Sequence, residues 1–315
     1  MINLPTVKQL RYMVALDELQ HFGQAAEACY VSQSAFSIAI KELESTLNVR
    51  LVDRTSKSIT ITPEGRQVAA KARVWLNELE NLVEGLEKQT EPLAGKLTLG
   101  VIPSIAPFFL PGLLPGLRKR FPALKLYLRE RITQILYDEL MAGQIDVLLL
   151  ALPYELKHVE IMTLFEDPFW LACHEHTHWL DPRHYQEEGL AAESVLLLDD
   201  GHCLREHTLA ACKLRDLDAV SRYAATSLFT LLHMVDSDMG ITFLPEMARN
   251  SALLRETRIR VYPLPGKSYR EIGLAWRKNS ARGDEFKLLG RFIQEQQRAM
   301  ASRAAEIDSE NWMVA

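Results

Sequence analysis

The feature that most constrains the fold of this chain is a regular alternation of strand-like and helix-like segments after residue 95. The segments are, in order, a strand over 97–102, a helix over 105–120, a strand over 124–128, a helix over 133–142 and a buried strand over 147–151. This order predicts an α/β domain with a largely parallel sheet, continuing through 168–276 and closing with a helix at about 284–304. Ligands of such sheets bind beyond the carboxyl ends of the strands, so the turn at Pro103 and Ser104 is a candidate site edge.

A long helix is predicted over residues 63–90, ahead of this domain. Pro63 and Glu64 suit a helix start, and Pro92 and Gly95 end it with a hinge. Apolar residues recur in it at steps of three and four, namely Val68, Ala72, Trp75, Leu76, Leu79, Leu82, Val83 and Leu86. A stripe this narrow and long predicts packing on the same helix of a second chain, whereas a helix that lies on its own domain is the alternative.

Length and composition limit the class of protein. The 315 residues suggest about two domains. The sequence contains no run of about 18 apolar residues, so we expect no membrane-spanning helix. The start of the sequence lacks the pattern of a signal peptide, so we expect a cytoplasmic protein. The net charge of −5 excludes a chain coated in positive charge, but a DNA-binding module needs only a local basic patch. Because the sequence has no phosphate loop, nucleophile elbow or zinc-ligand pair, we expect neither an enzyme nor a cofactor or metal site.

Residues 23–48 predict two helices joined by a short turn. Ala25, Ala26 and Cys29 form a small-residue face that allows close helix crossing, and Ser32 is a good N-cap for the second helix. Ile38, Leu43 and Leu47 give that second helix an apolar face. The pair is typical of a helix-turn-helix, whose second helix enters the major groove N-terminus first.

This geometry directs Gln33, Ser34 and Ser37 toward DNA, where glutamine can read a base edge and serine can bind base or phosphate. The basic residues Arg50, Arg54 and Lys57 follow on a predicted β-wing and could meet phosphates. The alternative is an ordinary helical hairpin with solvated polar residues.

The same region resembles the signature of LysR-type transcriptional regulators over some 45 residues. The matching positions are Ala25, Ala26, Val31, Ser32, Gln33, Ser34, Ser37, Leu43, Glu44, Leu47, Asn48, Val49, Leu51, Asp53, Arg54, Thr62, Glu64 and Gly65. The resemblance implies a winged helix-turn-helix over 1–62, a dimerisation helix over 63–91 and a two-lobed α/β regulatory domain, like periplasmic binding proteins, over 92–303, with 304–315 as a tail. It also implies a homodimer or homotetramer on an operator in double-stranded DNA, with RNA polymerase as a partner and no membrane.

Two of the four cysteines, Cys203 and Cys212, lie nine positions apart. His202 and Arg205 flank Cys203 in a loop that leads into a predicted helix, and a cation and a helix N-terminus both lower a thiol pKa. The neighbouring acids Asp199, Asp200 and Glu206 oppose that shift. The alternative is a pair of buried structural thiols in a regulator that binds a small metabolite in the cleft between its lobes.

The segment from Asp200 to Arg205, together with Cys212, resembles the redox motif of the peroxide-sensing OxyR branch of this family. The resemblance implies a peroxidatic Cys203, a resolving Cys212, and peroxide bound by Ser104, Thr133 and His202 in the control of oxidative-stress genes. Ser104 stands where that branch usually has threonine. Cys29 and Cys173 are interpreted as structural, and the histidines over 174–178 as a polar loop.

Overall fold

The computed structural model describes residues 4–54, 59–87, 92–186, 190–212, 214, 217–249 and 251–312. The chain divides into two compact units. The first contains Met1–Glu91 together with Asp138–Ile145, and the second contains Pro92–Tyr137 and Asp146–Ala315. Among the described residues, no helix combines the length and the apolar character that a bilayer crossing needs.

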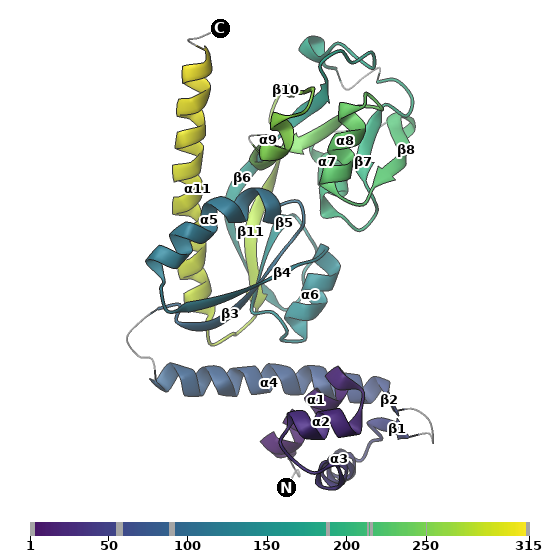
Figure 1. Ribbon diagram of the computed structural model, residues 1–315, viewed down its shortest axis with the longest axis vertical. Coiled ribbons are helices and arrows are strands. Elements are labelled where there is room, and N and C mark those ends of the chain that lie inside the picture. Colours follow the sequence, from purple (N-terminus) through teal and green to yellow (C-terminus); the bar gives the residue numbers. More distant parts are fainter. Residues whose placement is uncertain are drawn as a thin grey trace. The chain divides into compact units, whose positions relative to one another are not determined.

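The first unit holds three helices, a two-stranded wing and a long helix, all within its described residues (Figure 1). These are α1 (Val7–Leu19), α2 (Phe22–Ala28), α3 (Gln33–Leu47), β1 (Val52–Arg54), β2 (Ile59–Ile61) and α4 (Pro63–Glu87). Ser32 caps α3 as predicted, because its side chain accepts from the amide of Ala35 at 3.3 Å. Thr6 and Gln9 form a capping box at α1, so both helix starts are fixed locally.

The core of this unit corrects the predicted apolar face of α3. Phe36, Ile40 and Leu43 are fully buried, whereas Ile38 is 57% exposed. Residues 36, 40 and 43 follow the helical repeat along one face, and position 38 lies two residues away from it. The face that packs the helix pair is therefore built around the aromatic ring of Phe36, which stacks on Tyr12.

The wing is tied to α3 by Glu44, whose carboxylate accepts from the amides of Leu51 at 2.8 Å and Val52 at 3.1 Å. At the other end of the wing, the Thr62 hydroxyl caps α4 by accepting from the amide of Gly65 at 2.9 Å. A Cβ at position 65 would lie 2.2 Å from the Leu51 carbonyl oxygen, so only glycine allows this approach.

Helix α4 carries two apolar faces and not the single stripe that its sequence predicts. Ala69, Ala72 and Leu76 are buried, and the buried Arg73 pairs with Asp17 at 3.4 Å and Glu18 at 3.2 Å on α1. Trp75, Leu79, Leu82 and Val83 are instead 41–59% exposed. One face of α4 therefore packs within the first unit, and the other face is exposed to solvent. The side chain of Leu86 lies outside the described residues.

The second unit contains two lobes joined by long strands (Figure 1). The first lobe contains β3 (Gly95–Val101), α5 (Ala106–Arg120), β4 (Leu124–Glu130), the start of α6 (Thr133–Met141, whose residues from Asp138 on are grouped with the first unit), β5 (Val147–Leu152), the start of β6 (Val159–His174), β11 (Tyr269–Arg277) and α11 (Gly283–Trp312). The second contains the end of β6, β7 (Val195–Leu198), α7 (Cys203–Ala211), β8 (Val220–Ala225), α8 (Leu228–Asp236), β9 (Thr242–Pro245), α9 (Glu246–Arg249), α10 (Ala252–Arg255), β10 (Ile259–Pro263) and two short 3-10 helices, Pro182–His184 and Leu217–Ala219.

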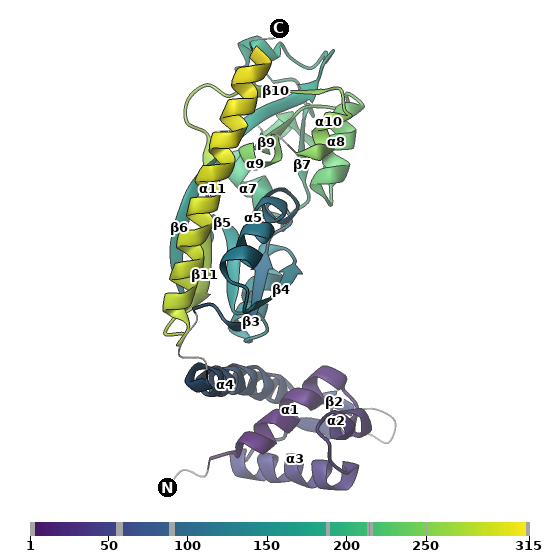
Figure 2. The same ribbon diagram turned by 60° about the vertical axis from the view of Figure 1, so that its left-hand side comes forward.

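The sheet of this unit is mixed, so the prediction of a largely parallel sheet is wrong. In the described part of the chain, β3 pairs in parallel with β4 and β5, while β5–β11, β11–β6, β6–β10 and β6–β9 are antiparallel. The reason is that β6 leaves the first lobe and β11 returns to it, which places two long strands side by side in opposite directions. Helix α11 packs along β6 and β11 (Figure 2) and continues to Trp312, beyond the predicted end near 304.

Candidate functional site

The two cysteines of interest lie at opposite ends of one helix. Cys203 is the first residue of α7, and Cys212 follows its last residue with its amide still bonded to the Thr208 carbonyl at 3.0 Å. Neither cysteine forms a disulfide, and both side chains are buried. Nine helical steps span about 13.5 Å, whereas a disulfide needs Cα atoms within about 7 Å, so the pair cannot bond while α7 is intact.

The turn before α7 presents Cys203 to the first lobe. The Asp199 amide donates to the Ala225 carbonyl at 2.9 Å, which continues the pairing of β7 and β8 into the turn. Gly201 has a φ of +94°, a left-handed conformation that glycine adopts without strain. His202 then takes the N-cap position without a side-chain cap. The α7 N-terminus and its free amides are therefore directed at the thiol.

A buried arginine that sequence reasoning missed organises this site. Arg270 and Asp167 are directly paired across β11 and β6, where the two strands cross between the lobes. Arg270 Nε donates to Asp167 Oδ2 at 3.0 Å, and both side chains are almost completely buried. From there the guanidinium reaches Ser104, with Nη1 2.8 Å from its hydroxyl and Nη2 3.0 Å from its carbonyl oxygen.

The electrostatics of Cys203 are set mainly by burial. Burial raises the pKa of the Cys203 thiol, while a hydrogen bond with Thr133, the positive charge of Arg270 and the amides of Cys203 and Leu204 lower it. The expectation that Arg205 is the relevant cation is not met, because Arg205 instead pairs with Asp200 at 3.1 Å. The cation that faces the thiol comes from Arg270, 67 positions along the chain.

Of the two hydroxyls named above, that of Thr133 hydrogen-bonds with the Cys203 thiol, and that of Ser104 bonds with Arg270. Ser104, after β3, is 3% exposed and accepts from Arg270. Thr133, the first residue of α6, is 1% exposed, and its hydroxyl has no polar partner among the described residues apart from the Cys203 thiol. A buried hydroxyl that lacks a second partner can hold a small polar ligand.

Another missed residue, His207, anchors α7 one turn beyond Cys203. Its Nε2 lies 2.9 Å from the carbonyl oxygen of Pro153, in the segment that follows β5. Burial lowers the pKa of His207, so the ring is neutral, and Nε2–H donates to that carbonyl. A histidine inside a helix gives little signal in sequence, since a polar residue there usually faces solvent.

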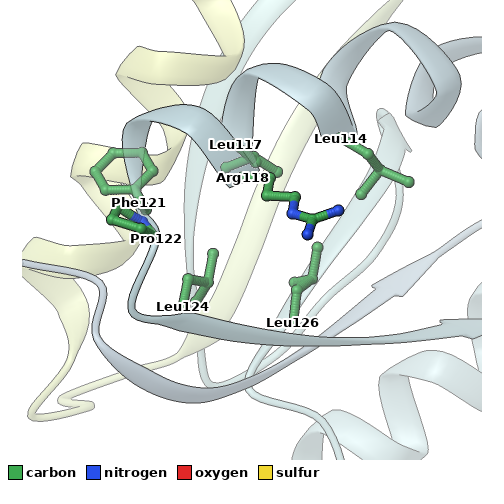
Figure 3. Close-up of a pocket in the computed structure, with 7 residues that line it drawn as sticks. All are labelled: Leu114, Leu117, Arg118, Phe121, Pro122, Leu124 and Leu126. Carbon is green, nitrogen blue, oxygen red and sulfur yellow. The ribbon is translucent and has the colours of Figure 1, made fainter.

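Among the cavities formed by the described residues of this unit, two adjoin α7. One of about 300 Å³ is bordered by Ser104 and His202, and one of about 200 Å³ by Cys212 and Tyr185 at the other end of the helix. A third, of about 320 Å³, lies between α5 and β4 (Figure 3). Its lining is apolar except for Arg118 and contains no thiol or hydroxyl, so it is separate from the cysteine site.

The helix-turn-helix presents its predicted DNA-facing residues at the start of α3. Gln33 and Ser34 are exposed and Ser37 is half-buried. Arg50 is exposed and lies 3.7 Å from Asp53, while Arg54 ends β1. Lys57 and the side chain of Arg54 lie outside the described residues. Tyr30, in the turn before α3, is 97% exposed beside these positions, although its sequence context gave no reason to select it.

Cys173 and the histidines over 174–178 lie in settings that differ from that of Cys203. Cys173 is fully buried in β6, and burial raises its pKa to about 11, so it stays a protonated thiol. His178 lies 2.7 Å from Asp238, and His174 accepts from the amide of His176. Within the described ranges, no three His, Cys, Asp or Glu residues are grouped so that they could hold a metal ion.

Comparison with known proteins agrees with this architecture. Residues 7–66 match the bacterial regulatory helix-turn-helix domain of the lysR family, and residues 90–298 match the LysR substrate binding domain. The chain is 36% identical over 290 residues to the HTH-type transcriptional regulator EstR of Acinetobacter baylyi, covering 92% of this chain and 96% of EstR. It is also 36% identical over 287 residues to the dual regulator OxyR of Escherichia coli, covering 91% and 94%.

A solved structure extends the likeness to the whole architecture. A full-length OxyR variant from Pseudomonas aeruginosa superposes with a TM-score of 0.76 at 32% identity, covering 92% of this chain and 98% of that one. The winged helix-turn-helix, linker helix and regulatory domain thus occur together in a related protein. This chain is a DNA-binding transcriptional regulator of the LysR family, and not an enzyme.

Proposed function

We propose that this regulator senses hydrogen peroxide through a reversible disulfide between Cys203 and Cys212 and controls oxidative-stress genes from the cytoplasm. The observation that carries the proposal is the environment of Cys203: a buried thiol at a helix N-terminus, beside Arg270 and a Thr133 hydroxyl with bonding capacity to spare. Relatives described as hydrogen peroxide-inducible genes activators, 34–37% identical, add support.

In the proposed reaction, Cys203 loses its proton and its thiolate attacks one oxygen of the peroxide. The S–O bond forms, the O–O bond breaks, and the departing hydroxide takes a proton and leaves as water. Thr133, Ser104 and His202 hold the peroxide, and Arg270 stabilises the negative charge on sulfur and on the leaving oxygen. Cys203 is then a sulfenic acid.

Resolution requires α7 to open. Cys212 attacks the sulfenic sulfur, the S–S bond forms, and a second water departs with the Cys212 proton, so that two thiols are oxidised as one peroxide is reduced. Because the intact helix separates the cysteines by about 13.5 Å, part of α7 must unwind first. Unwinding also breaks the bond from His207 to Pro153, which couples the chemistry to the junction between the lobes.

The same proposal assigns DNA contacts to the first unit. Gln33, Ser34 and Ser37 on α3 contact base edges or phosphates, and Arg54 and Lys57 on the wing contact phosphates. The exposed apolar face of α4 pairs with a second copy, giving a dimer that assembles into a homotetramer on the operator and acts through RNA polymerase.

The experiment that tests the switch is thiol counting with mass mapping of the full chain after a small excess of peroxide. A Cys203–Cys212 link is expected. Cys203→Ser should abolish the response, and Cys212→Ser should stop at a sulfenic acid or mixed disulfide. Unchanged thiols in the unaltered protein would refute the proposal.

One observation favours a second candidate, a regulator that binds a small metabolite between its lobes. The cavity of about 300 Å³ beside Ser104 has the size of a small ligand site. This candidate predicts a ligand-dependent change in DNA binding that survives the replacement of both Cys203 and Cys212 by serine. The peroxide proposal predicts that the double replacement removes regulation.

A further inference from the structure

The cavity beside the Cys203 site is larger than hydrogen peroxide requires. Its volume is about 300 Å³, whereas a water molecule takes a share of roughly 30 Å³ of the liquid and a peroxide about twice that. Ser104 and His202 form the border of the cavity nearest the thiol, since Ser104 is bonded to Arg270 and His202 directly precedes Cys203. The other lining residues come from both lobes.

The walls of this volume are mainly apolar. They are formed by Pro107, Phe108, Leu198, Leu228, Phe229 and Leu253. Its serine hydroxyls are already engaged, because Ser104 accepts from Arg270 and Ser227 accepts from the Thr230 amide at 3.1 Å. The one acidic group of the lining, Glu130, is exposed at the end of β4 and disfavours an anionic ligand. These walls suit an uncharged hydrocarbon group of moderate size.

We propose that this cavity is a subsite for the organic group of an uncharged alkyl or aryl hydroperoxide, which oxidises Cys203 in addition to hydrogen peroxide. The inference rests on the proposed peroxide reaction at Cys203 and names a second substrate class for it. The organic group occupies the apolar volume, and the hydroperoxide end passes Ser104 and His202 to the sulfur. Burial of that group provides affinity that hydrogen peroxide cannot obtain.

The chemistry needs no further reactant. The Cys203 thiolate attacks the terminal oxygen of the hydroperoxide, the S–O bond forms and the O–O bond breaks. The departing alkoxide takes one proton and leaves as an alcohol, while the sulfur becomes a sulfenic acid that Cys212 resolves as before. The alcohol product retains the organic group, so it should compete for the same cavity.

The test compares cumene hydroperoxide with hydrogen peroxide on the full, reduced chain, with Cys203 oxidation followed by mass mapping of quenched samples. Leu253→Trp adds bulk to the apolar lining of the cavity and should lower the rate constant for cumene hydroperoxide about tenfold or more, leaving that for hydrogen peroxide within about twofold. Leu254→Trp is the matched control, since Leu254 is the next residue of α10 and packs on the same core but does not line the cavity.

A second measurement avoids substitutions. In the unaltered protein, 2-phenyl-2-propanol has the shape of cumene hydroperoxide without the peroxide bond, and it should slow the cumene hydroperoxide reaction competitively. A parallel fall of both rate constants in Leu253→Trp, an equal effect of Leu254→Trp, or no competition by the alcohol would overturn the subsite. If cumene hydroperoxide fails to oxidise Cys203 while hydrogen peroxide succeeds, the subsite alone is refuted, whereas failure of hydrogen peroxide refutes the proposed function as well.

Discussion

Replacing Arg270 by methionine tests the organising role of the buried ion pair. The substitution keeps an apolar chain of similar length but removes the cation and leaves Asp167 unpaired in a fully buried position. Breaking such a pair from one side costs about 3–5 kcal/mol of the free energy of unfolding. For a domain of this size each kcal/mol lowers the Tm by about 2–4 °C, so a fall on the order of 10 °C is expected.

The stability that Arg270→Met loses should depend on pH in a defined direction. Burial already raises the pKa of Asp167 against the opposing effect of Arg270, and loss of that cation raises it further. A carboxyl whose pKa is higher in the folded than in the unfolded state binds its proton more tightly when folded. The penalty in Arg270→Met is therefore smallest below the unfolded pKa of about 3.9 and grows as the pH rises from there to the folded pKa.

A second substitution separates stability from chemistry. Adding Asp167→Asn to Arg270→Met removes the stranded charge and should restore a large part of the lost stability in urea unfolding. Oxidation of Cys203 by peroxide should stay slower than in the unaltered chain, on the order of tenfold or more, because the thiolate still lacks its cation. If the oxidation rate recovers together with the stability, Arg270 has only a structural role and the electrostatic reasoning is wrong.

Three other predictions concern the first unit. Ser34→Ala should lower sequence preference at one half-site position by about 1–3 kcal/mol if the contact reads a base, and binding titrations on operators that differ at that position would detect it. Leu79→Glu with Leu82→Glu places charge on the exposed face of α4 and should give monomers with poor DNA affinity, whereas unchanged light scattering would exclude that face as the dimer seam. Gly65→Ala should destabilise the wing in thermal unfolding, because the new Cβ would meet the Leu51 carbonyl oxygen at 2.2 Å; an unchanged Tm would contradict this packing.

The elements of this fold are largely readable from sequence, because their signals are local. The cap at Ser32, the start of α4 at Pro63 and the boundaries of α5 and β4 lie within two residues of their predicted positions. Pairing between strands is not local. The antiparallel pairing of β6 with β11 arises because the chain leaves one lobe and returns to it about a hundred residues later. The hydrophobic pattern of the two strands does not reveal this pairing.

In the candidate site, too, some residues could be predicted from the sequence and others could not. The sequence around Cys203 and Cys212 indicates the two thiols, and the family resemblance indicates Ser104 and Thr133. In the structure Thr133 and Arg270 act on the Cys203 thiol, and Arg270 bonds with Ser104. The residue that connects them, Arg270, was missed because an arginine within an apolar strand differs little from an edge residue in sequence. Its partners are 103 and 166 positions away.

In the proposed switch, the stability of the helix between the two cysteines contributes to the reduction potential of the pair. If the disulfide forms only when α7 opens, every contribution to the stability of α7 opposes oxidation and raises the reduction potential of the pair. A two-electron couple shifts by about 30 mV for 1.4 kcal/mol, so one added kcal/mol of helix stability corresponds to roughly 20 mV. Ala210 is an exposed position in the last turn of α7, at the end of the helix away from Cys203, and changes in helix propensity there would adjust the peroxide threshold of the proposed switch.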